Sequence, residues 1–302
     1  MSERAHTLGV VHSDTGTETP PALDADALRR VLVEGPDAPY SSLEVVEDIG
    51  STNAELLARA AAGAADRSVL LAEHQASGRG RLGRVWTAPP RTQVAVSVLL
   101  RPGAVSPTLF GWLPLVTGLA IRDGLREVGG VDATLKWPND VLVDGRKIAG
   151  ILAEMTTVPA GGDYSVRLPA IVVGVGINVS LSRAQLPVPH ATSLALAGGS
   201  VDRDRLAQAV LEALALRHGQ WRECERGSGS TISDTLMTTY SEACSTIGAD
   251  VRVELPGDIV RTGRADRVDR DGRLVVVDTD GEFPVAAGDV THVRGVGGRW
   301  GG

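Results

Sequence analysis

The sequence has few residues that could build a covalent or metal-bound scaffold. Its only cysteines are Cys224 and Cys244, which form no CxxC pair and join no Cys/His cluster at zinc spacing. Neither a disulfide framework nor a structural zinc site is therefore expected. We predict two reduced thiols and no metal-ligating side chains.

A long apolar run at the start and a surplus of positive charge are also missing. Residues 1–21 mix His, Asp, Glu, Thr and Gly without an apolar stretch, which argues against a signal peptide or a membrane span. A cytoplasmic location follows by default. The net charge of −7 disfavours a general nucleic-acid binder, because non-specific affinity comes from neutralising phosphates with Lys and Arg.

Two common nucleotide-binding motifs are absent as well. No glycine-rich run ends in Gly-Lys-Ser or Gly-Lys-Thr, so an ordinary P-loop is not expected. The segment Gly174-Val175-Gly176 lacks the third glycine of the dinucleotide-binding fingerprint. Any anion site must be local and built in another way.

The 302 residues allow two domains with a sizeable core. Apolar periodicity predicts helices within 24–33, after Thr52, over 109–128 and over 203–221, with strands at 69–72, 94–100, 141–143, 148–152 and 170–179. Asp144-Gly145 predicts a type I′ hairpin, and Gly227 to Ser230 a loop. Short strands from Asp250 onward predict a small all-β domain of SH3-like size. We divide the chain into a flexible extension (1–40), a main domain (41–247), the β domain (248–294) and a flexible tail (295–302).

The most unusual segment runs from Gly78 to Trp86 and carries Arg79, Arg81 and Arg84 between glycines. Glycine lets backbone N–H groups approach an anion closely, and arginine offers forked donors that stay charged. This alternation predicts a phosphate- or carboxylate-binding loop. A solvated basic loop, or an RNA-contacting segment, is the competing interpretation.

Three other clusters are weaker when taken alone. Thr52 to Glu55 has capping-box spacing, which puts Ser51, Thr52 and Asn53 at a helix N-terminus. Lys136 to Asp140 runs from a strand into a proline-bent turn. For Asn139 and Asp140, a role as turn formers is at least as probable as a ligand contact, and Trp137 is more often a core residue. In Gly174 to Asn178, the glycines permit either close approach of a ligand or a plain β-bulge.

Together and in this order, these clusters resemble the catalytic domain of the biotin protein ligases. The shared pattern is Ser51-Thr52-Asn53, Gln75, Gly78 to Trp86, Lys136 to Asp140, Arg146 to Leu152 and Gly174 to Asn178. The resemblance implies an α+β fold, with a mixed or antiparallel sheet and packed helices as in class II synthetases. It also implies that the C-terminal domain is an SH3-like barrel, and that the chain is of the ligase-only type without an N-terminal winged helix.

The same resemblance implies the site. Biotin is expected to contact Ser51, Thr52, Asn53, Gln75, Arg79, Gly80, Arg81, Lys147 and Gly150. ATP and the adenylate are expected to contact Arg79, Arg81, Arg84, Trp86, Lys136, Asn139, Asp140 and Asn178. Lys147 and Arg81 are the expected catalytic residues.

The implied reaction forms biotinyl-adenylate from biotin and ATP with Mg²⁺, and then transfers biotin to a lysine of a biotin carboxyl carrier domain of an acyl-CoA carboxylase. The arginine loop is expected to be disordered without ligand, because it would order over an anhydride that water destroys. A lipoate or octanoate ligase is one alternative. A biotin-sensing repressor and an RNA-binding module are others, although few residues precede Ser51.

Overall fold

The computed structural model describes residues 19–160, 163–224, 231–255, 257, 259–286 and 289–293. Its helices are α1 (Ala25–Leu32), α2 (Thr52–Ala61), α3 (Leu113–Gly124), α4 (Arg203–Glu223) and α5 (Asp234–Ala243). Its strands are β1 (Ser42–Ile49), β2 (Ser68–Gln75), β3 (Gln93–Leu100), β4 (Thr134–Lys136), β5 (Asp140–Val143), β6 (Arg146–Ala160), β7 (Asp163–Asn178), β8 (Asp250–Leu255), β9 (Ile259–Val268), β10 (Leu274–Asp278), β11 (Gly281–Val285) and β12 (Asp289–His292). None of the described helices is long and apolar enough to cross a membrane.

The main domain is built on one mixed sheet of seven strands, in the order β1-β2-β3-β7-β6-β5-β4. Only the β1–β2 pair is parallel, and the other pairs are antiparallel. The expected α+β fold with a mixed sheet is confirmed. The predicted hairpin at Asp144-Gly145 is confirmed too, because both residues have the positive φ, 50° and 71°, that a type I′ turn needs.

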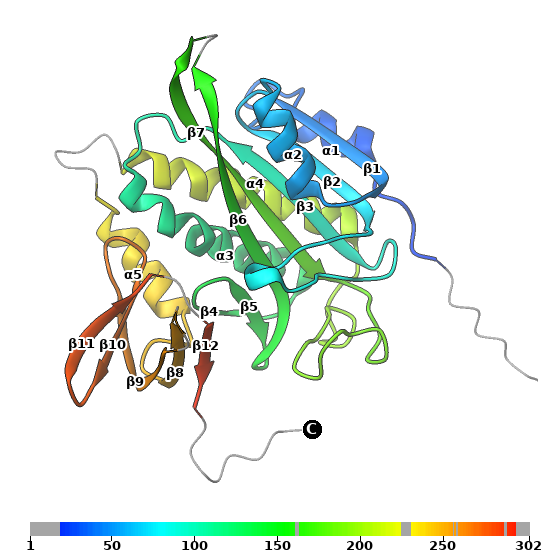
Figure 1. Cartoon of the computed structure of the whole chain (residues 1–302). Coiled ribbons are helices and arrows are strands. Elements are labelled where there is room, and N and C mark those ends of the chain that lie inside the picture. The colour runs from blue at the N-terminus through cyan, green and yellow to red at the C-terminus, as the bar shows by residue number, and fades with distance from the viewer. Residues whose placement is uncertain are drawn as a thin grey trace, which may run out of the picture.

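Helices cover both faces of this sheet (Figure 1), as the alternation of apolar residues along the central strands requires. Leu70, Leu99 and Val172 pack with Leu56 of α2 in one cluster. Their strand neighbours, such as Leu71, Val98 and Val173, belong to the larger cluster with α3 and α4. The central strands are therefore buried on both sides and hold the site rigidly.

The segment that precedes β1 differs from the flexible extension expected over 1–40. Residues 1–18 lie outside the described residues, but α1 forms as predicted, with Asp24 accepting a hydrogen bond from the Ala27 N–H. Leu28 and Leu32, four residues apart, are buried against the main domain. The Leu23 N–H also donates to Glu73, whose carboxylate is paired with Arg203 inside the protein. Apolar spacing and this buried ion pair hold the segment in place.

The C-terminal strands form a separate antiparallel sheet in the order β11-β10-β9-β8-β12. This small sheet lies beside α5 and β4 (Figure 1). Its turn at Asp271 and Gly272 reaches into the main domain, where the indoles of Trp112 and Trp137 donate to the carbonyls of Arg270 and Gly272 at 3.0 and 3.1 Å. Trp137 is only 2% exposed, so its interpretation as a core residue is confirmed.

The sequence did not predict β1, α5 or β11. Strand β1 lies at the edge of the sheet and shows little alternation in its burial, which explains why its pattern is weak. Helix α2 begins one residue earlier than expected, since Ser51, and not Thr52, is the N-cap. The loop predicted around Gly227 to Ser230 and the tail at 295–302 lie outside the described residues.

Candidate active site

One cavity of about 670 Å³ gathers all the residues that the sequence analysis expected to contact biotin or ATP. Its wall contains the α2 N-terminus, the Gly78 to Trp86 loop, the first half of β6, the end of β7, and strand β12. The predicted residues on this wall are Ser51, Thr52, Asn53, Gln75, Arg79, Gly80, Arg81, Arg84, Trp86, Lys136, Asn139, Asp140, Lys147, Gly150 and Asn178. Segments more than 100 residues apart in the sequence thus meet at one place.

The first turn of α2 forms one end of the cavity. The Gln75 side-chain oxygen accepts from the Thr52 N–H at 2.9 Å and lies 3.0 Å from the Thr52 hydroxyl. Ser51 accepts from the Ala54 N–H as the N-cap. This leaves a helix N-terminus with fixed hydrogen-bonding groups, which suits a polar, uncharged ring system such as a urea.

Two residues that sequence reasoning missed hold this end together. The Ser97 hydroxyl of β3 is fully buried, 2.7 Å from Thr52 Oγ1 and 2.6 Å from Asn53 Oδ1. The Asn53 Nδ2 donates to Glu154 Oε2 at 2.8 Å and to the Leu152 carbonyl at 3.0 Å. Ser97 and Glu154 both lie in otherwise apolar or alternating strands. The signal available in the sequence was a polar side chain at a position expected to face inward.

The glycines of β6 and β7 make the floor of the cavity. An added Cβ at Gly174 would lie 2.8 Å from Asn53 Cγ, and one at Gly176 would lie 2.5 Å from Trp86 Nε1. A Cβ at Gly150 would lie 2.9 Å from Trp86 Cζ3. The register of β6 and β7 is regular at all three positions, so close approach, and not a β-bulge, explains the glycines.

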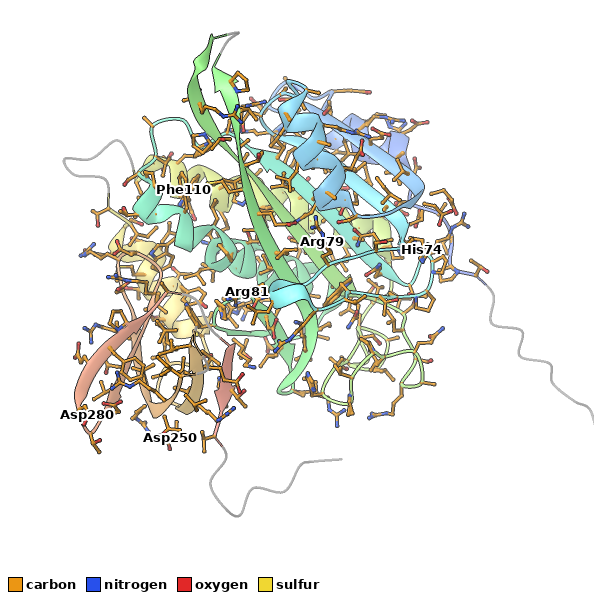
Figure 2. All side chains as sticks on the ribbon, viewed as in Figure 1. His74, Arg79, Arg81, Phe110, Asp250 and Asp280 are labelled. Atoms are coloured by element: carbon orange, nitrogen blue, oxygen red, sulfur yellow. The ribbon has the colours of Figure 1, made fainter. Side chains whose placement is uncertain are left out.

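The Gly78 to Trp86 loop crosses the sheet in front of β6 and β7, and Figure 2 shows Arg79 and Arg81 on it. The loop is closed on itself, since the Gly80 N–H donates to the Arg84 carbonyl at 2.7 Å and the Trp86 N–H donates to the Gly78 carbonyl at 2.9 Å. A short 3₁₀ turn at its tip places Leu82 and Gly83 at positive φ. Whether this loop is disordered without ligand stays a prediction.

The loop arginines reach toward the sheet. Arg79 Nη2 lies 3.4 Å from Glu154 Oε1, and Arg81 Nη1 donates to Asn139 Oδ1 at 3.3 Å. Glu154 therefore contacts both the loop and Asn53. The arginine cations are held at the mouth of the cavity before any substrate anion is present.

Lys147 follows the Asp144-Gly145 turn and points into the cavity. Its Nζ lies 2.6 Å from Asp140 Oδ1, and both side chains are largely buried. The same ammonium lies 5.5 Å from the centre of the Trp86 ring. Two hydrogen bonds to the 190–192 loop fix its backbone, from its N–H to the His190 carbonyl and from the Thr192 N–H to its own carbonyl. The lysine is thus a positioned cation and not a solvated one.

The two asparagines use part of their side chains for structure. Asn139 Nδ2 donates to the Ile151 carbonyl at 2.9 Å, and Asn178 Nδ2 donates to the Thr192 carbonyl at 2.9 Å. Both residues nevertheless line the cavity. The structural and the ligand-binding interpretations of these residues are therefore compatible.

His190 and His292, which the sequence did not single out, also line the cavity. Partial burial lowers the pKa of His190 from its ordinary value, and the cations Lys136 and Lys147 lower it further. His292 Nε2 lies 3.1 Å from the buried Thr246 hydroxyl, which accepts from the Trp137 N–H. The sequence signal for these residues was weak because isolated histidines in loops and at strand ends are common.

The described residues contain no group of three or more His, Cys, Asp or Glu side chains that could hold a metal ion. The cavity instead concentrates arginine and lysine around the carboxylate of Asp140, and Glu154, just outside its wall, pairs with Arg79. Such a set of donors suits carboxylate and phosphate groups, with the forked arginines providing bidentate contacts.

Comparison with known proteins agrees with this geometry. The sequence profile of the biotin/lipoate A/B protein ligase family matches residues 47–178. The chain is 42% identical to a biotin--[acetyl-CoA-carboxylase] ligase of Mycobacterium tuberculosis, over 91% of this chain and 97% of that protein. It is 30% identical to a bifunctional ligase/repressor of Bacillus subtilis, over 75% of this chain and 66% of that protein.

Among solved structures, the fold is similar to a biotin protein ligase from Aquifex aeolicus in complex with biotin and ATP. The TM-score is 0.67 at 25% sequence identity, and the match covers 85% of this chain and all of that one. The sequence resemblance, the fold and the assembled cavity agree, and the chain belongs to the biotin/lipoate A/B protein ligase family, among its biotin protein ligases.

Proposed function

We propose that this enzyme activates biotin with ATP to biotinyl-5′-AMP and transfers the biotin to a lysine of a biotin carboxyl carrier domain of an acyl-CoA or acetyl-CoA carboxylase. The observation that carries the proposal is the single cavity that joins a helix N-terminus at one end to an arginine- and lysine-rich wall at the other. One end fits a neutral cyclic urea, and the other fits a carboxylate next to phosphates.

Biotin is assigned to the α2 end of the cavity. Ser51, Thr52, Asn53 and Gln75 would contact the ureido ring, while Arg79, Gly80, Arg81, Lys147 and Gly150 would line the path of the acyl chain and its carboxylate. The nucleotide is assigned to the other end, with Arg79, Arg81, Arg84, Trp86, Lys136, Asn139, Asp140 and Asn178 around it. The two sets share Arg79 and Arg81, which places these arginines at the junction of the substrates.

The first step is an attack of a biotin carboxylate oxygen on the α-phosphorus of ATP. The new P–O bond forms as the bond from the α-phosphorus to the bridging oxygen breaks, and pyrophosphate leaves with the bonding electrons. Negative charge grows on the phosphate oxygens during this displacement. Lys147 and Arg81 are positioned to stabilise it, and one such preorganised donor contributes roughly 10²–10³ in turnover.

In the second step, the neutral amine of the acceptor lysine attacks the carbonyl carbon of the mixed anhydride. An amide bond forms, AMP leaves, and the amine loses its extra proton. Beyond Ile151, whose N–H and carbonyl are bonded to Asn139, no strand in the part of the chain that the structure describes pairs with the side of β6 that faces away from β7. Such an edge beside the cavity suits an extended acceptor segment, because main-chain hydrogen bonds can continue the sheet.

Magnesium is proposed as a companion of ATP. Two carboxylates are paired with cations that line the cavity: Asp140 with Lys147, and Glu154 with Arg79. This donor set fits an ion that arrives on the triphosphate, since Mg²⁺ usually takes one or two carboxylates and completes its shell with phosphates and water. When bound, it would neutralise the charge of the phosphates.

Three further expectations are kept as proposals. We place the protein in the cytoplasm, where ATP is available. We keep the proposed boundary between a main domain that ends at 247 and a β domain at 248–294, which falls between α5, ending at Ala243, and β8, starting at Asp250. The start of the main domain, expected at 41, is moved before α1, which is buried against it. We also propose that the chain binds no operator DNA, and a footprint on its own promoter region would contradict this.

The deciding experiment is isotope exchange between ATP and pyrophosphate, run with biotin, with lipoate or octanoate, and with no acid. Exchange that requires biotin is expected. Exchange that requires lipoate or octanoate would move the protein to the sister activity of the same family. If no exchange occurs with any of the acids, the adenylation step is refuted.

A further inference from the structure

Trp86 ends the arginine loop and has its indole laid on the floor of the cavity. The glycines at 150 and 176 make room for it, as a Cβ at either position would lie within 3.0 Å of the ring. Lys147 Nζ lies over the same ring at 5.5 Å. The orientation of this indole therefore decides the shape of the floor and the surroundings of the lysine ammonium.

One polar contact fixes that orientation. The indole Nε1–H of Trp86 donates to Gln93 Oε1 at 2.7 Å. Gln93 is the first residue of β3 and pairs with Asn178 of β7. The residue is 1% exposed, so its side chain can change position little, and it does not belong to the cavity wall.

The backbone of Gln93 is held from behind. Its carbonyl accepts from Arg203 Nε at 3.0 Å, and Arg203 is paired with Glu73 in the buried contact that also holds the segment before α1. These contacts come from three distant parts of the chain. They fix the backbone of Gln93, so that its side-chain oxygen accepts from the Trp86 indole at a defined position.

The Gln93 side-chain amide is not the side chain that would make the fold most stable at this position. Its Nε2 group is buried and finds no hydrogen-bond acceptor among the described residues. A buried donor without an acceptor destabilises the fold, and an apolar side chain of similar size would avoid that cost. The presence of glutamine at this position is better explained by the hydrogen bond that its side-chain oxygen accepts from the Trp86 indole.

We propose that Gln93 is a positioning residue for the adenylation reaction, acting through its hydrogen bond to the indole of Trp86. This inference rests on the proposed function, in which Trp86 lies on the nucleotide side. Gln93 sets the ring so that the nucleotide meets a preformed surface, while biotin binding at the α2 end does not depend on it.

The test compares Gln93→Met, Trp86→Phe and the double variant by steady-state kinetics of biotin-dependent pyrophosphate exchange. Gln93→Met keeps the volume but removes the acceptor, and Trp86→Phe keeps an aromatic ring but removes the donor. Each single variant is expected to raise KM for ATP about 2- to 10-fold, the effect of one neutral hydrogen bond. KM for biotin should stay within about 2-fold of wild type.

The double variant separates the contact from its surroundings. If the hydrogen bond is the cause, Gln93→Met adds no further rise in KM for ATP once Trp86 is Phe, because coupled residues are not additive. The unfolding midpoint of Gln93→Met should stay close to that of the wild type, since the substitution removes the unpaired Nε2 donor but leaves the Trp86 indole N–H without its acceptor. A merely structural glutamine would instead lower the midpoint and affect both substrates alike.

Failure of the inference and failure of the proposed function give different results. Normal biotin-dependent exchange with an unchanged KM for ATP in Gln93→Met overturns the positioning role and leaves the function standing. Fully additive effects in the double variant also overturn it. An absence of biotin-dependent exchange in the wild type removes the function, and the positioning role with it.

Discussion

Removal of the Lys147 ammonium is the most direct test of the proposed chemistry. The Lys147→Met substitution keeps most of the aliphatic chain that lies near Trp86 and deletes the charge. The fold should survive, because the backbone of Lys147 keeps its two hydrogen bonds to the 190–192 loop. Asp140 lines the cavity and loses its partner at 2.6 Å, so the unpaired and largely buried carboxylate should lower the unfolding midpoint without abolishing the fold.

The size of the effect follows from the role of the cation. A preorganised donor at a developing anion contributes about 10²–10³ in turnover, which corresponds to about 2.7–4 kcal/mol of transition-state stabilisation. Lys147 is held by Asp140 and by its backbone before substrate binds, so little reorganisation is needed. We therefore expect kcat for biotin-dependent pyrophosphate exchange to fall by at least about 10²-fold.

The assay needs two controls. Arg126→Met removes a cation in the short π-helical segment Leu125–Gly129 that follows α3, where Arg126 forms an exposed pair with Asp132, and it should leave exchange unchanged. Lys147→Arg keeps the charge but not its geometry, and it should recover only part of the activity because the guanidinium is planar and larger. Exchange by Lys147→Met within about 3-fold of wild type would refute the reasoning, because the effect of one preorganised donor is far larger.

Three further predictions concern other parts of the site and of the fold. Glu154→Gln keeps the contact with Asn53 but weakens the pair with Arg79, so trypsin should cut the arginine loop several times faster, and an unchanged digestion rate would show that Glu154 does not hold the loop. Gly176→Ala places a Cβ 2.5 Å from Trp86 Nε1, so KM for ATP should rise more than about 10-fold, whereas Gly219→Ala in α4 meets nothing within 4 Å and should stabilise the helix by about 1 kcal/mol; equal kinetics in the two variants would contradict the close approach. Burial lowers the pKa of His218 to about 3, so the unfolded chain binds one more proton below the ordinary pKa of about 6.5, and the free energy of unfolding should fall by about 1.4 kcal/mol per pH unit from pH 6 toward pH 4 through this group. The free energy of unfolding of His218→Gln, measured by denaturant titration at several pH values, should fall less steeply with pH by this amount. The same pH dependence as in the wild type would mean that the histidine is not held neutral.

Local pattern was enough to predict much of the fold. The helices at α1, α3 and α4, and the strands β2, β3, β6 and β7, are long or strongly periodic, and each buries an apolar face. The Asp144-Gly145 turn could be predicted because its chemistry is local. Strand β1 could not, since an edge strand in which only Leu43 is fully buried offers little hydrophobic signal.

In the candidate site, the residues that would contact the substrates could be predicted from the sequence, but the residues that orient them could not. The residues that would meet the substrates form short, unusual runs such as Gly78 to Trp86, and a resemblance could be recognised from them. The residues that orient them are scattered, as Ser97, Glu154 and Gln93 illustrate. Each is a single polar side chain in a strand, and only the pairing of strands reveals what it faces. Long-range register is a property of the whole fold and is not encoded in any local window.

The C-terminal domain takes part in the site through the same kind of contact. The indole of Trp137 donates to the Gly272 carbonyl, and its backbone N–H donates to the Thr246 hydroxyl, which lies 3.1 Å from His292. Trp137 belongs to the turn that carries Asn139 and Asp140 into the cavity. A shift of the β domain would therefore move this turn, and with it the carboxylate that holds Lys147. The small sheet is thus part of the apparatus that positions the reacting groups, which explains why strand β12 lies at the wall of the cavity and not at a distance from it.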